Sequence, residues 1–446
     1  MPVIFSIAAG LPASIALAVA SCLLTLQSAY SVLLLLYAWE DSDKLVSNRA
    51  PATFEAPATS FTVLLPARHE EAVIRNTIRR IAALNYPAEL LEILIIVEAG
   101  DHGTLRCVRE AIADVASRLP DRLRLLTFDR PPINKPHGLN VGLAQARGEV
   151  VTIFDAEDEP HPDILQVVNT VLLREGARAV QCGVQLMNYA DRWFSGLNVL
   201  EYFFWFRSRM HYQAAMNMVA LGGNTVFVER AVLREVNGWD ERCLTEDADL
   251  GIRLSAAGVP IRVLYDDRYV TREETPPTVG QFIRQRTRWN QGFLQVLAKG
   301  DWRRLPGRRQ RLLALYTLAA PLLQALMMIY IPVSLWTIVQ VKTPTLIALI
   351  STLPLYMLVI QFTVNLVGLY EFAGQHELRP SLLSPLLLLV SYLPYQWLLS
   401  LAALRALWRQ LRGVNNWEKT AHVGLAGSAN PLEASIEPLA REMGAG

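Results

Sequence analysis

The sequence predicts an α/β domain with a mostly parallel sheet and flanking helices, inserted between transmembrane helices. Segments of strand character alternate with helical segments between residues 50 and 310. Long runs that contain no charged residue flank this region. The 446-residue chain is 52% hydrophobic and only 19% charged, whereas about a quarter of a typical soluble domain is charged. Together these observations indicate a globular domain attached to a membrane.

The uncharged runs are long enough to cross a bilayer, which takes about 20 apolar residues in a helix. They comprise residues 1–39, 312–341, 343–370 and 380–404. The first run contains Ala18–Val19–Ala20, which is similar to a signal-peptidase site. No positive residue precedes it, however, and apolar sequence continues to Leu36, so it predicts an uncleaved anchor.

Positive residues beside the runs predict the orientation. Lys44 and Arg49 follow the first run, five arginines lie at 303–311, and three lie at 405–412. Because such clusters stay on the cytoplasmic side, the α/β domain and the C-terminal tail are expected to be cytoplasmic in a multi-pass plasma (inner) membrane protein. An even number of crossings must then follow the domain. We therefore expect one of the three later runs, 312–341, to lie along the membrane surface.

The α/β region divides into alternating strands and helices. The expected strands are 61–66, 92–98, 122–127, 149–155, 178–186 and 261–265. The expected helices are 70–84, 104–118, 137–147 and 162–174. This alternation favours a parallel sheet covered by helices, and ligands of such sheets bind beyond the carboxyl ends of the strands. Functional residues are therefore expected directly after strands.

Composition disfavours several functional classes. The net charge of +1 argues against a nucleic-acid partner. Four cysteines without paired spacing predict neither a disulfide framework nor structural zinc. No GxxxxGK[ST] or GxGxxG motif is present, and the apolar runs contain no ionisable Asp, Glu, Lys or Arg of the kind that marks ion pathways. A non-catalytic transporter or scaffold is therefore the least favoured alternative.

Three of the expected strands end in acidic loops. The acids are Glu70, Glu71, Glu98, Asp101, Asp155, Glu157, Asp158 and Glu159. Helix capping explains one acid in each loop but not the three within residues 155–158. Clustered carboxylates are costly unless a cation neutralises them, and hard oxygen ligands suit Mg²⁺ or Mn²⁺. The sequence therefore predicts a metal site that leaves positions open for substrate phosphates.

Two further motifs carry chemistry. Thr245-Glu246-Asp247 precedes a helix, where Thr245 can cap and a carboxylate on the rigid helix start is well placed as a base. Residues 285–289 (QRTRW) lie in a helical stretch at 278–297. The Arg288 guanidinium suits a diphosphate, and Trp289 offers a face for a sugar ring. The alternative is an amphipathic helix with Arg and Trp at a membrane surface.

Taken in order, these motifs resemble those of the membrane-embedded family 2 glycosyltransferases, which include cellulose, hyaluronan and chitin synthases. The matching segments are Glu98 with Asp101, DAED at 155–158, TED at 245–247, QRTRW at 285–289, KPHGLN at 135–140, LGGN at 221–224 and WEKTAH at 417–422. Two positions depart from the pattern. Glu98 stands where the family usually has Asp, and Glu157 is the second acid of the DxD motif. The assignment between Glu157 and Asp158 therefore stays open.

The resemblance implies a GT-A domain that transfers a hexosyl unit from a UDP-sugar with inversion, giving a β-glycosidic linkage and using Mg²⁺ or Mn²⁺. It implies Asp247 as the catalytic base with Glu246 beside it, and a metal held by Asp155, Glu157 and Asp158. The implied donor-binding residues are Glu98, Asp101, Lys135, Gln285 and Arg288. The implied acceptor-binding residues are Gly222, Gly223, Asn224 and Trp289.

The expected organisation has five parts. They are an anchor at 1–49, the GT-A domain at 50–276, an interface region at 277–311, transmembrane helices at 312–408 and a cytoplasmic tail at 409–446. A growing polysaccharide is the favoured acceptor, and a membrane lipid such as diacylglycerol that receives one sugar is the alternative. Membrane lipids are expected partners, and oligomerisation is left open.

Overall fold

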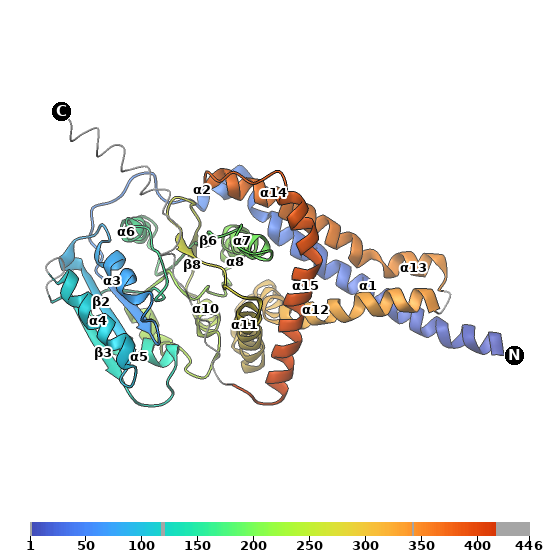
Figure 1. Ribbon diagram of the computed structural model, residues 1–446, viewed down its shortest axis with the longest axis horizontal. Coiled ribbons are helices and arrows are strands. Elements are labelled where there is room, and N and C mark those ends of the chain that lie inside the picture. The colour runs from blue at the N-terminus through green and yellow to red at the C-terminus, as the bar shows by residue number, and fades with distance from the viewer. Residues whose placement is uncertain (1, 117–120, 341–342, 416–446) are drawn as a thin grey trace.

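The computed structural model describes residues 2–116, 121–340 and 343–415. The chain begins with the long helix α1 (Pro2–Leu36), followed by η1 (Tyr37–Trp39) and α2 (Ser42–Ser47), and then enters an α/β domain (Figure 1). Most of the tail expected at 409–446, with the WEKTAH segment at 417–422, lies outside the described residues.

The centre of the domain is a seven-stranded sheet with the order β3-β2-β1-β4-β7-β5-β8. Its strands are β1 (Phe61–Ala67), β2 (Leu91–Glu98), β3 (Leu123–Phe128), β4 (Val150–Ile153), β5 (Ala179–Cys182), β7 (Val226–Glu229) and β8 (Ile261–Leu264). Strand β7 is antiparallel to β4 and β5, and every other pair is parallel. The predicted mostly parallel sheet is confirmed.

Helices cover both faces of this sheet, which explains why its strands are almost continuously apolar. Val63 and Leu65 of β1 pack in one core with α3 (Ile74–Ala82), α4 (His102–Val115) and α6 (Ile164–Glu175). Leu64, which points to the other face, packs with Leu139 of α5 (Lys135–Gln145) in a second core. The period-2 alternation of a strand thus divides β1 between the two cores.

The expected strand at 178–186 is two strands. β5 belongs to the main sheet, whereas β6 (Val184–Leu186) pairs with β9 (Thr271–Glu273) in a separate two-stranded sheet. Gly183 lies between them, and a Cβ there would lie 2.8 Å from the Tyr265 ring. The close approach of this ring requires glycine at the division. Strands β7 and β9 were not predicted from the sequence because they are too short for alternation to show.

The remaining helices carry the other motifs. They are η2 (Ala88–Leu90), α7 (Ser195–Phe204), the π-helical turn η3 (Trp205–Arg209), α8 (Met210–Ala215), α9 (Arg230–Glu235), α10 (Glu246–Ala256), α11 (Val279–Lys299) and η4 (Asp301–Arg304). The TED motif forms the start of α10, and QRTRW lies within α11. Thr278 caps α11 by accepting the N–H of Gln281 at 3.3 Å, which fixes where this helix begins.

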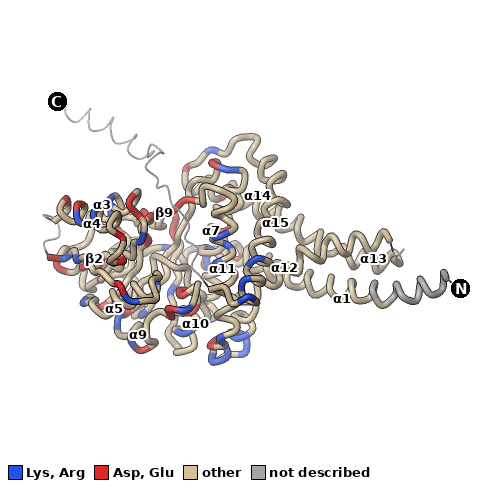
Figure 2. The backbone as a smooth tube through the Cα atoms, turned by 60° about the horizontal axis from the view of Figure 1, so that its bottom comes forward, with Lys and Arg blue, Asp and Glu red and all other residues tan. Residues whose placement is uncertain are grey.

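Among the described residues, four helical segments are long and apolar enough to cross a membrane. They are Ser14–Trp39, Arg308–Gln340, Thr345–Gln375 and Ser384–Leu411. The corresponding helices after the domain are α12 (Arg308–Gln340), α13 (Thr345–Ser351), α14 (Leu353–Gln375) and α15 (Ser384–Leu411). Figure 2 shows that charged residues concentrate in the domain and hardly occur on the helices that extend from it.

The run at 312–341, expected to lie along the membrane surface, belongs to α12. Helix α12 continues through Pro321 and Pro332, and it extends away from the domain together with α1 and α13 in both views (Figures 1 and 2). Helix α15 instead stays beside the domain and packs against α11 and α12. The placement of these helices relative to a membrane stays a prediction.

Candidate active site

A pocket opens at the carboxyl ends of β1 and β4, where the strand-end rule places ligands. Its cavity volume is about 270 Å³ and it opens to solvent, which places it near the lower end of the range for small-molecule sites. The polar side chains that line it are Arg68, His69, Glu70, Asn134, Lys135, Asp155, Glu157 and Arg288. Four predicted site residues, from three separate motifs, thus lie in one pocket.

Lys135 connects two of these motifs. It begins α5, whose N-terminus is capped by Asn134 through its Oδ1, which accepts the N–H of His137 at 3.0 Å. The Lys135 ammonium forms an ion pair with Asp155. Burial opposes its charge, yet the negative charges of Asp155, Glu246 and Asp247 raise its pKa above the usual value. The DAED and TED motifs therefore face the same positive charge.

The TED carboxylates lie in a water-poor environment. Burial and the neighbouring charge of Asp247 raise the pKa of Glu246 to about 7. Burial also raises the pKa of Asp247, although the charges of Lys135 and Arg288 oppose the shift. Gly223, at φ +94°, packs against this acid, and a Cβ there would lie 2.9 Å from Asp247 Oδ2. Of the two acids, Asp247 is the more exposed, and neither is among the residues that line the pocket.

Helix α11 lies directly on the TED loop. A Cβ at Gly292 would lie 2.4 Å from Thr245 Oγ1 and 2.7 Å from Thr245 N, so no larger residue fits at this contact. Gln295, three positions on, accepts the N–H of Leu244 at 2.9 Å. These contacts bring Arg288, one turn before Gly292, to the pocket. Sequence reasoning missed Gly292, although its spacing from QRTRW was available as a signal.

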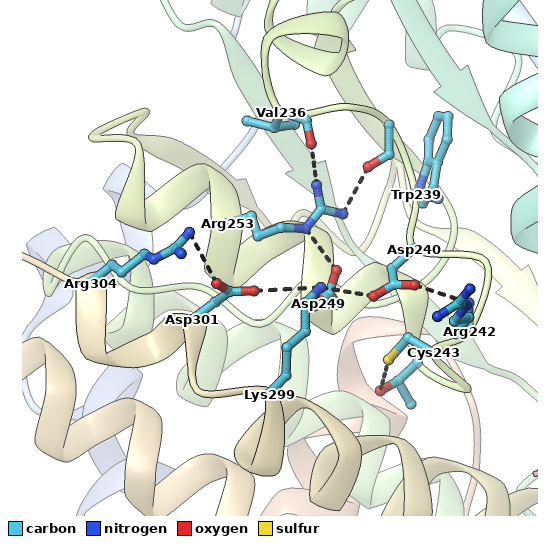
Figure 3. Close-up of polar contacts among 12 residues, drawn as sticks. Val236, Trp239, Asp240, Arg242, Cys243, Asp249, Arg253, Lys299, Asp301 and Arg304 are labelled. Atoms are coloured by element: carbon cyan, nitrogen blue, oxygen red, sulfur yellow. Dashed lines mark hydrogen bonds and ion pairs between the residues drawn. The ribbon is translucent and has the colours of Figure 1, made fainter.

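A buried ion network holds α10 and α11 together (Figure 3). Asp249 is fully buried and accepts from Arg253 Nε at 2.7 Å and from Lys299 Nζ at 2.7 Å. Arg253 also donates to the carbonyl oxygens of Val236 and of Gly238, the latter at 2.8 Å. The network fixes the first turn of α10, which carries the TED acids, against the end of the QRTRW helix.

We expect Asp249→Ala to lower the free energy of unfolding by about 1.5–3 kcal/mol, because it removes the buried carboxylate that accepts charge-assisted hydrogen bonds from Arg253 and Lys299. Thermal or denaturant unfolding of the full chain in detergent measures this loss. Asp114→Ala is the control, since it removes an exposed partner of Arg79 and surface pairs contribute about 0–1 kcal/mol. Equal effects of the two substitutions would contradict the structural role of Asp249.

Two predicted donor-binding residues are engaged elsewhere. Asp101 is 4% exposed and accepts the N–H groups of His69 at 2.6 Å and Thr104 at 3.1 Å, which caps α4. Burial raises its pKa, but these donors outweigh burial and hold it below the usual value. Glu98 forms an ion pair with Arg68 at 2.8 Å. Neither acid is among the residues that line the pocket, whereas Arg68 is, and donor binding by Glu98 and Asp101 stays a prediction.

The third acid of the DAED loop also points inward. Asp158 is fully buried, and its Oδ2 accepts the N–H of Asp155 at 2.7 Å. Asn224 Nδ2 donates to both Asp158 oxygens, at 2.8 and 2.9 Å, and to Glu273. Asp158 and Asn224 thus bind each other inside the protein, and their roles as metal ligand and acceptor contact stay predictions. Both organise the loop that presents Asp155 and Glu157.

The other expected acceptor residues occupy distinct positions. The N–H of Gly222 donates to Gln181 at 2.8 Å, and a Cβ there would lie 2.9 Å from the Phe206 ring, so Gly222 serves packing. Trp289 is half-buried, with the Arg286 guanidinium 4.7 Å from its ring centre and the Tyr202 ring 6.2 Å away. Gln285, in the preceding turn of α11, is buried and does not line the pocket.

The chemistry of the pocket acids fits a divalent cation. Asp155 and Glu157 both line the pocket and offer hard oxygen ligands, which Mg²⁺ and Mn²⁺ prefer. Another group, His69, Glu71 and Asp101, has its ligand atoms within 4.8 Å of one another. Its carboxylate from Asp101 already caps α4. The DAED loop therefore fits a metal that also contacts a substrate in the pocket.

Comparison with known proteins identifies the family. The family described as "Glycosyltransferase like family 2" matches residues 57–292, more than half of the chain. The chain belongs to glycosyltransferase family 2. The match begins just before β1 and ends at Gly292, so it contains every pocket residue named above. The enzyme is a glycosyltransferase, as the motifs predicted.

Curated relatives match more than half of the chain. A probable glycosyltransferase, YdaM of Bacillus subtilis, is 29% identical over 250 residues, which cover 55% of this chain and 57% of the relative. A beta-monoglucosyldiacylglycerol synthase of Trichormus variabilis is 29% identical over 237 residues, which cover 52% of this chain and 49% of the relative. A poly-beta-1,6-N-acetyl-D-glucosamine synthase of Staphylococcus epidermidis is 26% identical over 282 residues, which cover 60% of this chain and 62% of the relative. The matches thus span about half to three fifths of these relatives.

A solved structure shares the fold. A mannosyltransferase from Pyrobaculum calidifontis, in complex with GDP-Man and Mn²⁺, superimposes with a TM-score of 0.52 at 20% identity. The match covers 88% of this chain and 99% of that one. At this identity the likeness concerns the fold, and it confirms the GT-A-like sheet with flanking helices.

Proposed function

We propose that this transferase moves a hexosyl unit from a UDP-sugar to an acceptor hydroxyl at the membrane, with inversion at the anomeric carbon. The observation that carries the proposal is the meeting of Lys135, Arg288, Asp155 and Glu157 in one pocket, beside Asp247. The cationic side chains suit a diphosphate, and the acid suits a hydroxyl proton. The mannosyltransferase of similar fold binds GDP-Man, a nucleotide sugar, which supports a donor of this class.

The leaving group is a nucleoside diphosphate whose negative charge increases as the sugar departs. Arg288 binds its oxygens through charge-assisted hydrogen bonds, which strengthen as that charge develops. Lys135 adds a second positive charge on the same side of the pocket. Mg²⁺ or Mn²⁺ held by Asp155 and Glu157 supplies Lewis-acid stabilisation of the diphosphate when it is bound.

Asp247 takes the proton from the acceptor hydroxyl as its oxygen attacks the anomeric carbon. The raised pKa of Asp247 suits this role, because a base works best when its pKa approaches the working pH. No covalent intermediate forms, so an α-linked donor yields a β-linked product.

We expect transfer to fall as the pH drops through the pKa of Asp247, since only the ionised carboxylate accepts a proton. Burial raises the pKa of Asp247, and the positive charge of Lys135 opposes that shift. Lys135→Gln removes this charge, so we expect the acid limb of the remaining activity to move to higher pH by about one unit. Initial rates of UDP release between pH 5 and 9 measure the shift. An acid limb that stays in place or moves to lower pH would contradict the electrostatic coupling of Lys135 and Asp247.

The acceptor is proposed to be a growing polysaccharide. Trp289, held by Arg286 and Tyr202, offers an aromatic face that suits an acceptor sugar ring, and one relative is named as a polysaccharide synthase. A second candidate is diacylglycerol, because relatives of equal or greater similarity are named beta-monoglucosyldiacylglycerol synthases. Both acceptors place the reaction next to a membrane.

We propose that α1, α12 and the α13–α14 segment cross the plasma membrane and that α15 lies along its cytoplasmic surface. This arrangement gives two crossings after the domain. It therefore satisfies the even number required by the positive clusters at 44–49, 303–311 and 405–412. The transferase domain is then cytoplasmic, where nucleotide sugars are available.

Purified full-length protein in liposomes with Mg²⁺ and a panel of UDP-sugars tests the proposal by UDP release. A high-molecular-weight product digestible by a β-glycanase supports the polysaccharide acceptor. Release that requires diacylglycerol and yields one sugar per lipid supports the second candidate. Absence of turnover with every UDP-sugar, under conditions in which UDP binds, would overturn the proposed donor class.

A further inference from the structure

A second pocket lies where the first long helix meets the transferase domain. It is a small cavity of about 20 Å³ that opens to solvent, and it shares no lining residue with the active-site pocket. Its walls come from the segment after α1, the π-helical turn with the start of α8, and the end of α14. The residues that matter here are Lys44, Asn48, Arg49, Arg207, His211 and Asp267. Nothing in the proposed transfer reaction uses them.

Three of these residues are buried and carry polar atoms without a hydrogen bond. Arg207, Asn48 and His211 are 6%, 3% and 8% exposed. Within the described part of the chain, Arg207 Nη1, Asn48 Oδ1 and His211 Nδ1 have no hydrogen-bond partner. Since buried polar groups are almost always bonded, three such atoms from residues around one pocket indicate a polar ligand.

The geometry of Arg207 supports a fixed binding group. Its Nη2 forms an ion pair with Glu371 of α14, and its guanidinium lies 5.0 Å from the centre of the Phe203 ring. Asn48 is tied to the same turn, because its Nδ2 donates to the Arg207 carbonyl at 3.4 Å. The guanidinium is therefore held in place while Nη1 keeps its donor capacity.

The lining of the pocket is basic, and two acids just outside it balance this charge, so the unbonded Nη1 of Arg207 is the group that favours an anion. Lys44, Arg49 and Arg207 contribute three positive charges, against which the lining residues contain the single acid Asp267. Outside the lining, Glu40 pairs with Lys44 and Glu371 with Arg207. Burial lowers the pKa of His211 to about 4, so its neutral ring adds a hydrogen-bonding group without charge at neutral pH. An oxyanion with several acceptor oxygens satisfies these groups best.

The position of the pocket identifies the source of that anion. Ala38 and Gln375, which lie at the ends of the apolar segments Ser14–Trp39 and Thr345–Gln375, both line it. Given the proposed membrane crossings, this is the depth at which lipid phosphates lie. We propose that the pocket binds the phosphate of a membrane phospholipid of the cytoplasmic leaflet, with Arg207 as its buried anchor and Lys44 and Arg49 at its rim.

Native mass spectrometry of the detergent-solubilised full chain tests this binding. The probes are phosphatidylglycerol, diacylglycerol, which lacks the phosphate, and inorganic phosphate. The rim variant Lys44→Ala/Arg49→Ala is compared with Arg308→Ala/Arg309→Ala, which removes the same charge from exposed positions beside another long helix. His211→Gln tests the buried wall separately.

We expect one phosphatidylglycerol to remain bound to the wild type and to the 308/309 variant, and at least a tenfold lower occupancy in the rim and His211 variants. Diacylglycerol is expected to show no such retention. If both double variants lost the same amount of bound phosphatidylglycerol, general surface charge and not the pocket would explain the binding, and the site would be overturned. Retention of inorganic phosphate at the same occupancy as the lipid would overturn the lipid as the source. A soluble, folded rim variant that keeps full occupancy would overturn the proposal itself.

Discussion

Asp247→Asn is expected to lower the rate of sugar transfer by about 10²–10⁴-fold, the usual contribution of a general base, with donor binding unchanged. The amide has nearly the size of the carboxylate, so the contact with Gly223 and the start of α10 are kept. What the variant loses is the ability to take a proton from the acceptor hydroxyl. Steady-state kinetics gives the rate, and calorimetric titration with UDP gives the affinity for the leaving group.

Glu246→Gln is the matched control, because it makes the same chemical change one residue earlier. Glu246 is more deeply buried than Asp247, and we place it beside the base without proton transfer to substrate. We therefore expect it to keep most of the rate at the pH optimum. Full transfer by Asp247→Asn, with UDP still bound, would show that another group is the base.

The catalytic motifs could be found from the sequence because each is local. Asp155 and Glu157 directly follow a buried strand, and Asp247 lies in the first turn of a helix, so short segments fix their positions. The rule that ligands bind at the carboxyl ends of strands then brings the motifs to one edge of the sheet. Lys135 and Arg288 reach the same pocket, although 153 positions separate them (288 − 135).

The supporting contacts could not be found in this way, because they join distant segments. Asn224 and Asp158 are 66 positions apart, and Asn224 and Glu273 are 49 apart. Nothing in the sequence near Asn224 shows that its amide lies between two buried carboxylates. The motif resemblance predicts an acceptor contact for Asn224, and the fold adds the hydrogen bonds by which it holds the DAED loop.

The contacts of Asp101 and the position of α15 likewise depend on segments that are distant in the sequence. An acid that follows a strand can bind a ligand or cap a helix. Only the positions of His69 and Thr104 in the fold show that Asp101 caps a helix. For α15, apolar length predicts a membrane helix, but contacts with α11 and α12 determine how it lies. Hydropathy measures whether a helix prefers lipid, and it does not measure orientation relative to neighbouring helices.

Gly292→Ala is expected to reduce transfer by about 100-fold, the usual effect of a displacement of roughly 1 Å at a catalytic group. The new Cβ would lie 2.4 Å from Thr245 Oγ1 and 2.7 Å from Thr245 N, so α11 and the TED loop must separate. Arg288 on α11 and Asp247 on α10 then move apart. Because neither side chain is altered, the loss of rate reports their relative position alone. Turnover numbers and the affinity for UDP, measured on the same preparation, check this expectation.

Gly280→Ala provides the control on the same helix. The nearest atom to a Cβ at Gly280 is Arg284 Nη1, at an ordinary contact distance of 3.8 Å, so this variant keeps α11 in place. If both alanine variants retained wild-type rates, close packing of α11 on Thr245 would not be required for catalysis. A loss of transfer rate in Gly292→Ala alone would instead show that the spacing between QRTRW and Gly292 is needed for α11 to pack on the TED loop. QRTRW must be followed, one turn later, by a residue small enough for its helix to rest on the TED loop.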